Sequence, residues 1–284
     1  MPFRAKLRTP FSDLADHLVD AANDRQIIYI PNPGNFGDGL IRHGTKLLFS
    51  DYGIDHYELN IGYSRIKYQL FPLLLKQSRY HFVYGGGGAW SSNYAFGERI
   101  AKLIASRTRR LTILPSTFGL ENPPATGTLF RRDEQQSKDT APNSIFCHDM
   151  AFYTAARKQA DCWLYPEPKK ALGIMMRTDH ESRFAQANIS DLPDNEDISL
   201  EGDHMSPGSE FLMRVSEYET IYTDRLHIAI AACLVGRKVK LLTGNYFKIK
   251  AIYDATLAPH FSDLVELMPD DFTLEDIAKK TALV

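Results

Sequence analysis

Short apolar runs alternate with stretches of helical periodicity along most of the chain. The runs are rich in β-branched and aromatic residues and end in Gly, Pro, Asn or Asp, which is typical of buried strands followed by turns. The predicted strands are residues 26–30, 56–59, 81–84, 111–115, 144–148, 171–176, 219–223, 238–242 and 265–268. The predicted helices are residues 11–22, 64–76, 96–107, 207–217, 226–234 and 273–282, with one more running to about residue 49 and one beginning at Lys248.

This alternation predicts an α/β protein built from two Rossmann-like, doubly wound halves with parallel sheets. The chain of 284 residues is long enough for both. The best candidate linker is residues 161–170, which contain Pro166 and Pro168. We therefore expect an N-terminal domain over residues 1–165 and a C-terminal domain over residues 166–284, with a cleft between them. The last helix is expected to pack back on the first domain.

The predicted helix at residues 226–234 is almost wholly apolar and therefore buried, yet its start is polar. Asp224 suits the N-cap, and Arg225 and His227 fall in or beside the first turn. The helix macrodipole disfavours positive charge at this end of a helix. Cations at this position therefore indicate that an anion binds among them. The alternative is that Arg225 pairs with a carboxylate and that His227 is a satisfied buried histidine.

Two glycine-rich loops follow predicted strands. One contains Asn35, Gly37 and Asp38, and Asp38 would also cap the next helix. The other is the run at residues 85–88, which suits a close approach by a ligand or by another backbone segment. Trp90, just beyond it, is a candidate for stacking on a sugar or for the core.

Composition and residue spacing argue against several classes of protein. A net charge of −2 does not indicate a nucleic-acid-binding protein, because such proteins usually carry excess positive charge. The three cysteines and the scattered histidines show no metal-ligand spacing, so we expect no metal. No apolar stretch reaches the roughly 20 residues of a membrane span, and the N-terminus lacks the apolar segment of a signal peptide. We expect a cytoplasmic protein with reduced thiols.

Four separated segments within roughly residues 27–255 resemble motifs of the polysaccharide pyruvyl transferase family. They are Gly34-Asn35-Phe36-Gly37-Asp38, residues 129–137 with Arg132 and Ser137, residues 148–152, and Thr223-Asp224-Arg225-Leu226-His227 followed by Gly236 and Lys248. The glycine run after a strand is also a family feature. The resemblance implies a glycosyltransferase B-like fold. It also implies transfer of a pyruvyl group from phosphoenolpyruvate onto two sugar hydroxyls, forming a ketal and releasing phosphate.

The residues in these motifs have chemistry that suits the steps of this reaction, in which phosphoenolpyruvate is a substrate and no cofactor is needed. Arg132, Arg225 and Lys248 would bind its phosphate and carboxylate. His227 would transfer a proton, and Asp38 would orient or deprotonate a sugar hydroxyl. The loop residues Asn35, Gly37, Gly86 and Gly87, together with Trp90, would line the acceptor side. His148 and Arg237 depart from the family pattern and leave the acceptor open.

The expected acceptor is a lipid-linked oligosaccharide at the inner face of the cell membrane. Arg4, Lys6 and Arg8 precede an apolar stripe of Phe11, Leu14 and Leu18, which could rest on an anionic leaflet. The alternative is that this stripe packs on the first sheet. Two other functions stay open: a nucleotide-sugar glycosyltransferase, which needs a carboxylate that grips the ribose, and a non-catalytic glycan-binding homologue. The oligomeric state is open too.

Overall fold

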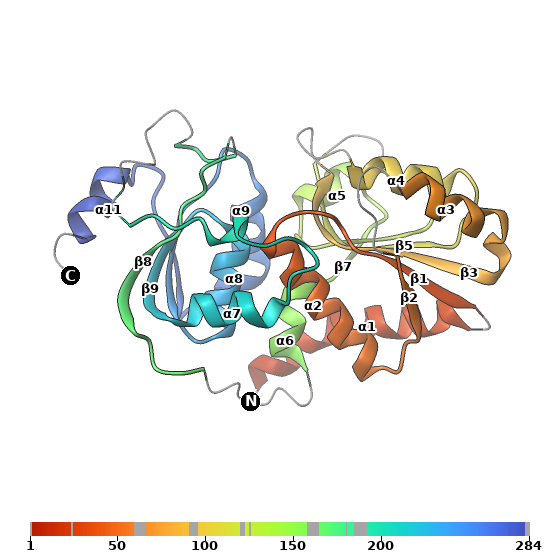
Figure 1. Ribbon diagram of the computed structural model, residues 1–284, viewed down its shortest axis with the longest axis horizontal. Coiled ribbons are helices and arrows are strands. Elements are labelled where there is room, and N and C mark those ends of the chain that lie inside the picture. Colours follow the sequence, from red (N-terminus) through yellow and green to blue (C-terminus); the bar gives the residue numbers. More distant parts are fainter. Residues whose placement is uncertain are drawn as a thin grey trace. The chain divides into compact units, whose positions relative to one another are not determined.

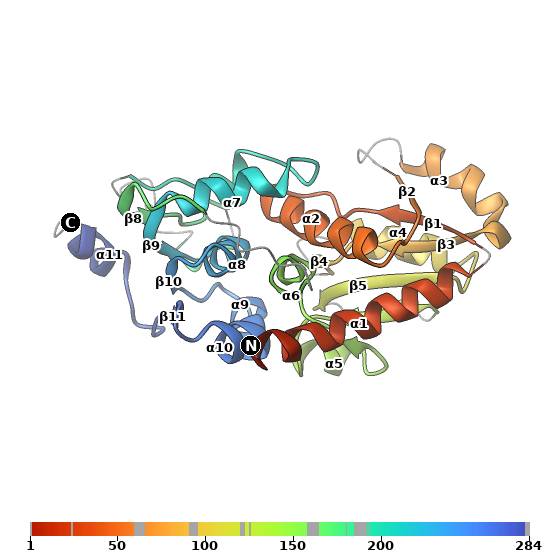
Figure 2. The same ribbon diagram turned by 90° about the horizontal axis from the view of Figure 1, so that it is seen from below.

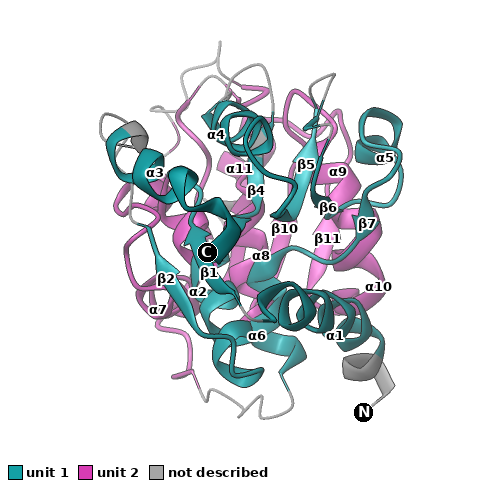
Figure 3. Cartoon of the chain, turned by 90° about the vertical axis from the view of Figure 1, so that its right-hand side faces the viewer, with its two compact units in different colours: residues 1–34, 41–159 teal, residues 35–40, 160–284 magenta. Residues whose placement is uncertain are grey.

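The computed structural model describes residues 2–23, 25–59, 66–90, 96–119, 123–124, 126–157, 165–179, 181–184, 192 and 194–281 (Figure 1). The chain forms two compact units (Figure 3). Unit 1 comprises residues 1–34 and 41–159, and unit 2 comprises residues 35–40 and 160–284. The predicted boundary after residue 165 lies six residues beyond this division. Residues 35–40 belong with the C-terminal unit, which no pattern in the sequence predicted.

Unit 1 is built on a parallel sheet of seven strands in the order β2-β1-β3-β5-β6-β7, with β4 paired to β5. Its strands are β1 (Gln26–Ile30), β2 (His56–Glu58), β3 (Tyr80–Tyr84), β4 (Gly87–Trp90), β5 (Leu111–Phe118), β6 (Thr128–Arg131) and β7 (Ile145–Phe146). The strand order reverses between β1 and β3. Ligands of open α/β sheets bind at the carboxyl ends of strands at such a point.

Helices cover both faces of this sheet, as Figures 1 and 2 show. Helices α3 (Ile66–Leu75) and α4 (Phe96–Ala105) lie on one face, and α1 (Pro2–Ala22) and α2 (Phe36–Asp51) on the other. Two short helices, α5 (Gln136–Thr140) and α6 (Tyr153–Ala156), complete the unit. The structure thus confirms a doubly wound, parallel α/β arrangement for the first half.

The N-terminal helix α1 is part of the unit 1 core. Phe11, Leu14 and Leu18 are 0% exposed, and the Phe11 ring meets Tyr153 of α6 edge-on at 5.3 Å between centroids. The Arg8 Nε donates to the Ala156 carbonyl at 2.9 Å. The expectation that this apolar stripe rests on a membrane is therefore wrong, because its side chains are already buried. The alternative, packing within the first half, is what the structure shows.

A hydroxyl on β5 contacts one histidine of α1 and one of β3, which links α1 to the sheet. The Nε2 atoms of His17 and His81 lie 2.9 and 2.8 Å from the Thr112 hydroxyl on β5. A hydroxyl both donates and accepts, so it can pair with two neutral imidazoles. Burial lowers the pKa of His17, and burial together with the charge on His17 lowers the pKa of His81 to about 4.

We predict a pH dependence of stability from His81. In the unfolded chain this imidazole takes up a proton below its ordinary pKa of 6.5, whereas in the fold it stays neutral down to about pH 4. Stability is therefore complete above pH 6.5 and is lost as the pH falls towards 4, by roughly 3 kcal/mol. Urea unfolding at pH 7 and pH 4.5 should show a smaller difference for His81→Gln than for wild type. His56→Gln is the matched control, and an equal effect of both variants would contradict the assignment.

Unit 2 is built on a four-stranded parallel sheet in the order β11-β10-β9-β8. Its strands are β8 (Lys170–Ile174), β9 (Tyr218–Thr223), β10 (Lys238–Leu241) and β11 (Val265–Leu267). Its helices are α7 (Gly208–Ser216), α8 (Leu226–Leu234), α9 (Lys248–Ile252), α10 (Ala258–Phe261) and α11 (Leu274–Thr281). The parallel sheet predicted for the second half is thus confirmed.

The last helix, α11, packs within unit 2. Ile277 is 0% exposed and joins a hydrophobic cluster with Ile174, Tyr222 and Leu242 of the second sheet. The expectation that this helix returns to the first domain is therefore wrong. The sheet of unit 2 would otherwise leave this apolar face open, since buried strands need cover on both sides.

Candidate functional site

The segments that follow β8, β9 and β10 in unit 2 bring six charged side chains together. We call these residues the charged cluster: Arg177, Asp179, Glu181, Asp197, Arg225 and Lys248. Parallel strands place their carboxyl ends at one edge of the sheet, which is where α/β proteins form ligand sites. The cluster holds three cations and three carboxylates, so its formal charges cancel.

Arg225, just before α8, is held by two carboxylates. Its Nε donates to Asp197 Oδ1 at 2.9 Å and its Nη2 to Asp197 Oδ2 at 2.5 Å, a bidentate pair. The same Nη2 lies 2.9 Å from Asp179 Oδ2. The alternative left open for Arg225, pairing with a carboxylate, is therefore realised. Its side chain is 5% exposed, so the charge of Arg225 is largely engaged by these two carboxylates.

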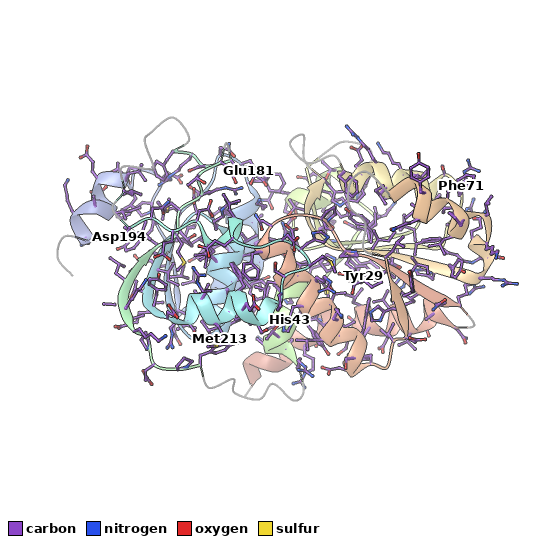
Figure 4. All side chains as sticks on the ribbon, viewed as in Figure 1. Tyr29, His43, Phe71, Glu181, Asp194 and Met213 are labelled. Atoms are coloured by element: carbon purple, nitrogen blue, oxygen red, sulfur yellow. The ribbon has the colours of Figure 1, made fainter. Side chains whose placement is uncertain are left out.

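Glu181 joins Lys248 to the cluster. The Lys248 Nζ lies 3.3 Å from Glu181 Oε2, and the Tyr246 hydroxyl donates to Glu181 Oε1 at 3.3 Å. Glu181 also pairs with Arg177, and its side chain is 1% exposed (Figure 4). Burial tends to raise the pKa of Glu181, but the charges of Lys248 and Arg177 prevail and lower it. Lys248 is the most exposed cation of the cluster, at 13%.

Asp179 is the most accessible carboxylate of the cluster, at 26%. It accepts from Arg177 Nε at 2.9 Å. Burial acts to raise its pKa, but the hydrogen bond from Arg177 and the charges of Arg225 and Arg177 bring it down to about 2. The cluster therefore presents a carboxylate that is ionised at any physiological pH.

Asp224 does not cap α8, contrary to the sequence-based expectation. It is 0% exposed, and its carboxylate accepts from the Arg177 amide at 2.7 Å and from the Ser182 hydroxyl at 2.8 Å. Burial raises its pKa. Thr223 Oγ1 accepts the Arg225 amide at 2.9 Å instead. Asp224 thus ties the loop after β8 to the end of β9, which helps to position Arg177 of the charged cluster.

Two segments far apart in the sequence meet within unit 2, at Gly37 and His227. A Cβ atom added to Gly37 would lie 2.5 Å from His227 Nδ1 and 2.8 Å from its Cβ. His227 is half-buried in the first turn of α8. Glycine is therefore required at position 37, because any side chain would occupy the space of the imidazole. The resemblance named both residues, but not their contact.

The segment around Gly37 is fixed by a reciprocal cap at the start of α2. Asn35 Oδ1 accepts the Gly37 amide at 2.9 Å, and Asp38 Oδ2 accepts the Asn35 amide at 3.1 Å. Such a capping box satisfies two amides that the helix leaves open. Asp38 takes part in the cap, as predicted, but from within the first turn, and Asn35 is the N-cap residue. An ionised carboxylate accepts several hydrogen bonds, so the cap leaves its predicted catalytic role untested.

Arg132 lies inside unit 1, at the end of β6. It is 0% exposed, its Nη1 pairs with the Asp149 carboxylate, and its Nε donates to Thr117 Oγ1 at 2.8 Å. Asp149 also accepts the Ala151 amide at 2.9 Å. A side chain that binds a substrate needs access to it, whereas Arg132 is enclosed by protein atoms. Its role in binding phosphoenolpyruvate therefore stays a prediction.

The glycine run of unit 1 serves close backbone packing. A Cβ on Gly86 would lie 2.3 Å from the Pro115 carbonyl oxygen, and Gly87 adopts φ +116°, which favours glycine. Trp90 is 1% exposed and its ring packs against Tyr84 and Phe118. Of the two roles left open for Trp90, the structure supports the core one and not stacking on a sugar.

The carboxylates of the charged cluster were missed by the sequence analysis. Asp197 lies 28 positions before Arg225, in an acidic stretch without helical periodicity. One local signal was present, since Arg177 and Glu181 are four residues apart with opposite charges. Among the residues the structure describes, no group of three or more His, Cys, Asp or Glu side chains is arranged to hold a metal ion.

Comparison with known proteins establishes the fold and no family. No protein-family model and no curated protein matches the chain. A functionally uncharacterised protein of Klebsiella pneumoniae subsp. pneumoniae NTUH-K2044 is 23% identical over 90% of this chain and 98% of its own, with a TM-score of 0.67. Two structures of the UDP-GlcNAc 2-epimerase of Methanocaldococcus jannaschii align over 91 and 92% of this chain and 92% of theirs, at 14% identity and TM-scores of 0.44 and 0.42. The chain thus shares the α/β fold of the Klebsiella protein.

Proposed function

We propose that this protein is a pyruvyltransferase that moves the pyruvyl group of phosphoenolpyruvate onto two hydroxyls of a glycan. The contact between Gly37 and His227 carries the proposal, because it joins the two segments that most resemble the polysaccharide pyruvyl transferase family. The proposal includes the glycosyltransferase B-like arrangement and the glycan precursor that the resemblance implies.

The reaction needs proton transfer and stabilisation of a leaving phosphate. One sugar hydroxyl adds to C2 of the enol while C3 takes up a proton. Phosphate then leaves, and the second hydroxyl adds to C2 and gives up its proton, which closes the ketal. His227 supplies the proton to C3, since histidine is the side chain that most often serves as a general acid or base. Asp38, three residues from Asn35 at the start of α2, accepts a hydroxyl proton.

The charged cluster refines the roles of the two cations in unit 2. Lys248 is the better candidate for direct contact with the phosphate, since it is the more exposed. Arg225 acts through Asp197 and Asp179, which it holds in place. A charge-balanced cluster suits a substrate whose charge changes during the reaction, because its dipoles are already oriented when phosphate departs.

We expect His227→Ala to lower kcat for phosphate release by about 10²–10⁴, the usual contribution of a general acid or base. The assay follows phosphate from phosphoenolpyruvate in the presence of oligosaccharide acceptors. Tm should change little, because His227 is half-buried at a helix start and not in the core. His260→Ala, on α10 of the same unit, is the matched control. Loss of Tm in step with activity would identify His227 as a structural residue instead.

A second function, nucleotide-sugar glycosyl transfer, is favoured by one observation. Such an enzyme needs a carboxylate that grips the ribose, and Asp179 is a partly exposed, ionised carboxylate at the edge of the second sheet. The same protein preparation should therefore be tested with nucleotide sugars in place of phosphoenolpyruvate. Turnover of a nucleotide sugar without phosphate release from phosphoenolpyruvate would replace the first proposal by the second.

A further inference from the structure

Helix α3 of unit 1 turns large apolar side chains towards solvent. Tyr68, Phe71 and Leu75 are 82, 56 and 68% exposed (Phe71 in Figure 4). Their spacing of three and four residues places them on one face of the helix. Leu70 and Leu74, on the opposite side, are 0 and 7% exposed and belong to the unit 1 core. Clustered exposure of this kind marks an interaction surface.

The sequence around α3 carries a net positive charge. Residues 59–97 contain four Lys or Arg residues and no Asp or Glu, although the whole chain is slightly acidic. Lys76 follows directly after α3, and Arg79 lies in the 3-10 turn after it; both are exposed. The apolar face therefore lies within a segment whose net charge is +4, counting Lys and Arg alone.

We propose that the outward face of α3 docks on an anionic phospholipid surface. Apolar and aromatic side chains beside cations are the combination that interfacial helices use, the first entering the headgroup region and the second pairing with lipid charge. A second copy of this chain is a poorer partner. A two-fold contact through α3 would bring the same cations together, which disfavours it.

The proposed contact of α3 with lipid would reach the headgroup region and would not cross the bilayer. Helix α3 has ten residues and spans about 15 Å, far less than a bilayer core. No helix in the described part of the chain combines the length and apolarity needed to cross a membrane. The inference concerns unit 1 alone and does not depend on the proposed activity, so either can fail without the other.

Sedimentation with vesicles tests the proposal. Vesicles of phosphatidylcholine containing phosphatidylglycerol should bind the full chain at least about tenfold more strongly than vesicles of phosphatidylcholine alone. The triple variant Tyr68→Ser, Phe71→Ser, Leu75→Ser should lose at least about tenfold in binding. Lys76→Glu with Arg79→Glu should abolish the preference for the anionic lipid. Tm should be unchanged in both variants, since the altered side chains face solvent.

The matched control is Met213→Ser, which removes an exposed apolar residue, 48% accessible, from α7 of unit 2 (Figure 4). It should bind vesicles like the wild type. Equal binding by wild type and triple variant, or equal binding to both lipids, would overturn the proposal. So would light scattering that shows a dimer of the wild type and a monomer of the triple variant, because the α3 face would then be an interface between copies of the chain.

Discussion

Arg132→Met is expected to destabilise unit 1 by about 3–5 kcal/mol, the cost of removing one partner of a buried ion pair. Arg132 and Asp149 are both 0% exposed, so the variant leaves the Asp149 carboxylate buried without its cation. For a unit of this size the loss corresponds to a fall in Tm of about 10 °C. Thermal unfolding followed by circular dichroism measures it.

The double variant Arg132→Met, Asp149→Leu should recover much of that stability, because it removes both charges together. Arg107→Met, which alters an exposed arginine of the same unit, should leave Tm within about 2 °C. If Arg132 instead serves mainly to bind substrate, Arg132→Met will keep its Tm and raise the KM for phosphoenolpyruvate. That outcome would restore the role that the family resemblance implies.

Many of the strands were predictable because their signals are local, whereas the N-terminal helix, predicted over residues 11–22, begins at Pro2. The strands β1, β3, β9 and β10 are short apolar runs bounded by turn residues, and the structure has each of them within one or two residues of its predicted range. Strand β4 (Gly87–Trp90) was not predicted, since two glycines argue against a strand. It forms because β5 offers it a partner, as the pairs Gly87–Ser116 and Trp90–Phe118 show.

The partners of the charged residues were not predictable in the same way. Arg225, His227 and Asp224 could be identified as polar positions at the start of an apolar helix, but their contacts come from the loop after β8 and from the segment at 35–40. Such contacts depend on how the loops return to the sheet edge, which no local pattern records. The Asp224 cap failed for this reason: a hydrogen bond from the Arg177 amide competes with the helix start for the same carboxylate.

The periodicity of apolar residues did not show which helix faces are exposed to solvent. The stripe of Phe11, Leu14 and Leu18 has clear helical periodicity and is wholly buried. Helix α3 is apolar on more than one side, so its pattern looks like that of a core helix, yet Tyr68 and Phe71 are exposed. Periodicity shows which residues share a face, whereas the rest of the fold decides whether that face is covered.

The second large effect is expected from Gly37→Ala, which should reduce activity by about 10² or more with a limited loss of stability. The new Cβ would lie 2.5 Å from His227 Nδ1 and 2.8 Å from both His227 Cβ and Cγ. Rotation of the ring cannot relieve all three contacts, because the His227 Cβ is fixed to α8. The imidazole and the capped segment must therefore move apart, at a cost of about 1–3 kcal/mol for overpacking.

Two further variants separate this contact from a general effect of replacing glycine. In Gly244→Ala, the nearest atoms to the new Cβ lie at 3.5 and 3.6 Å, an ordinary contact, so Tm and activity should be kept. Gly37→Ala combined with His227→Gly removes the obstructing side chain, so the two changes should be less destabilising together than the sum of each alone. This recovery of Tm without activity would show that Gly37 acts through the position of His227. Full activity of Gly37→Ala alone would mean that the close packing of residues 35–38 on α8 is not required, and the proposed function would lose the observation that carries it.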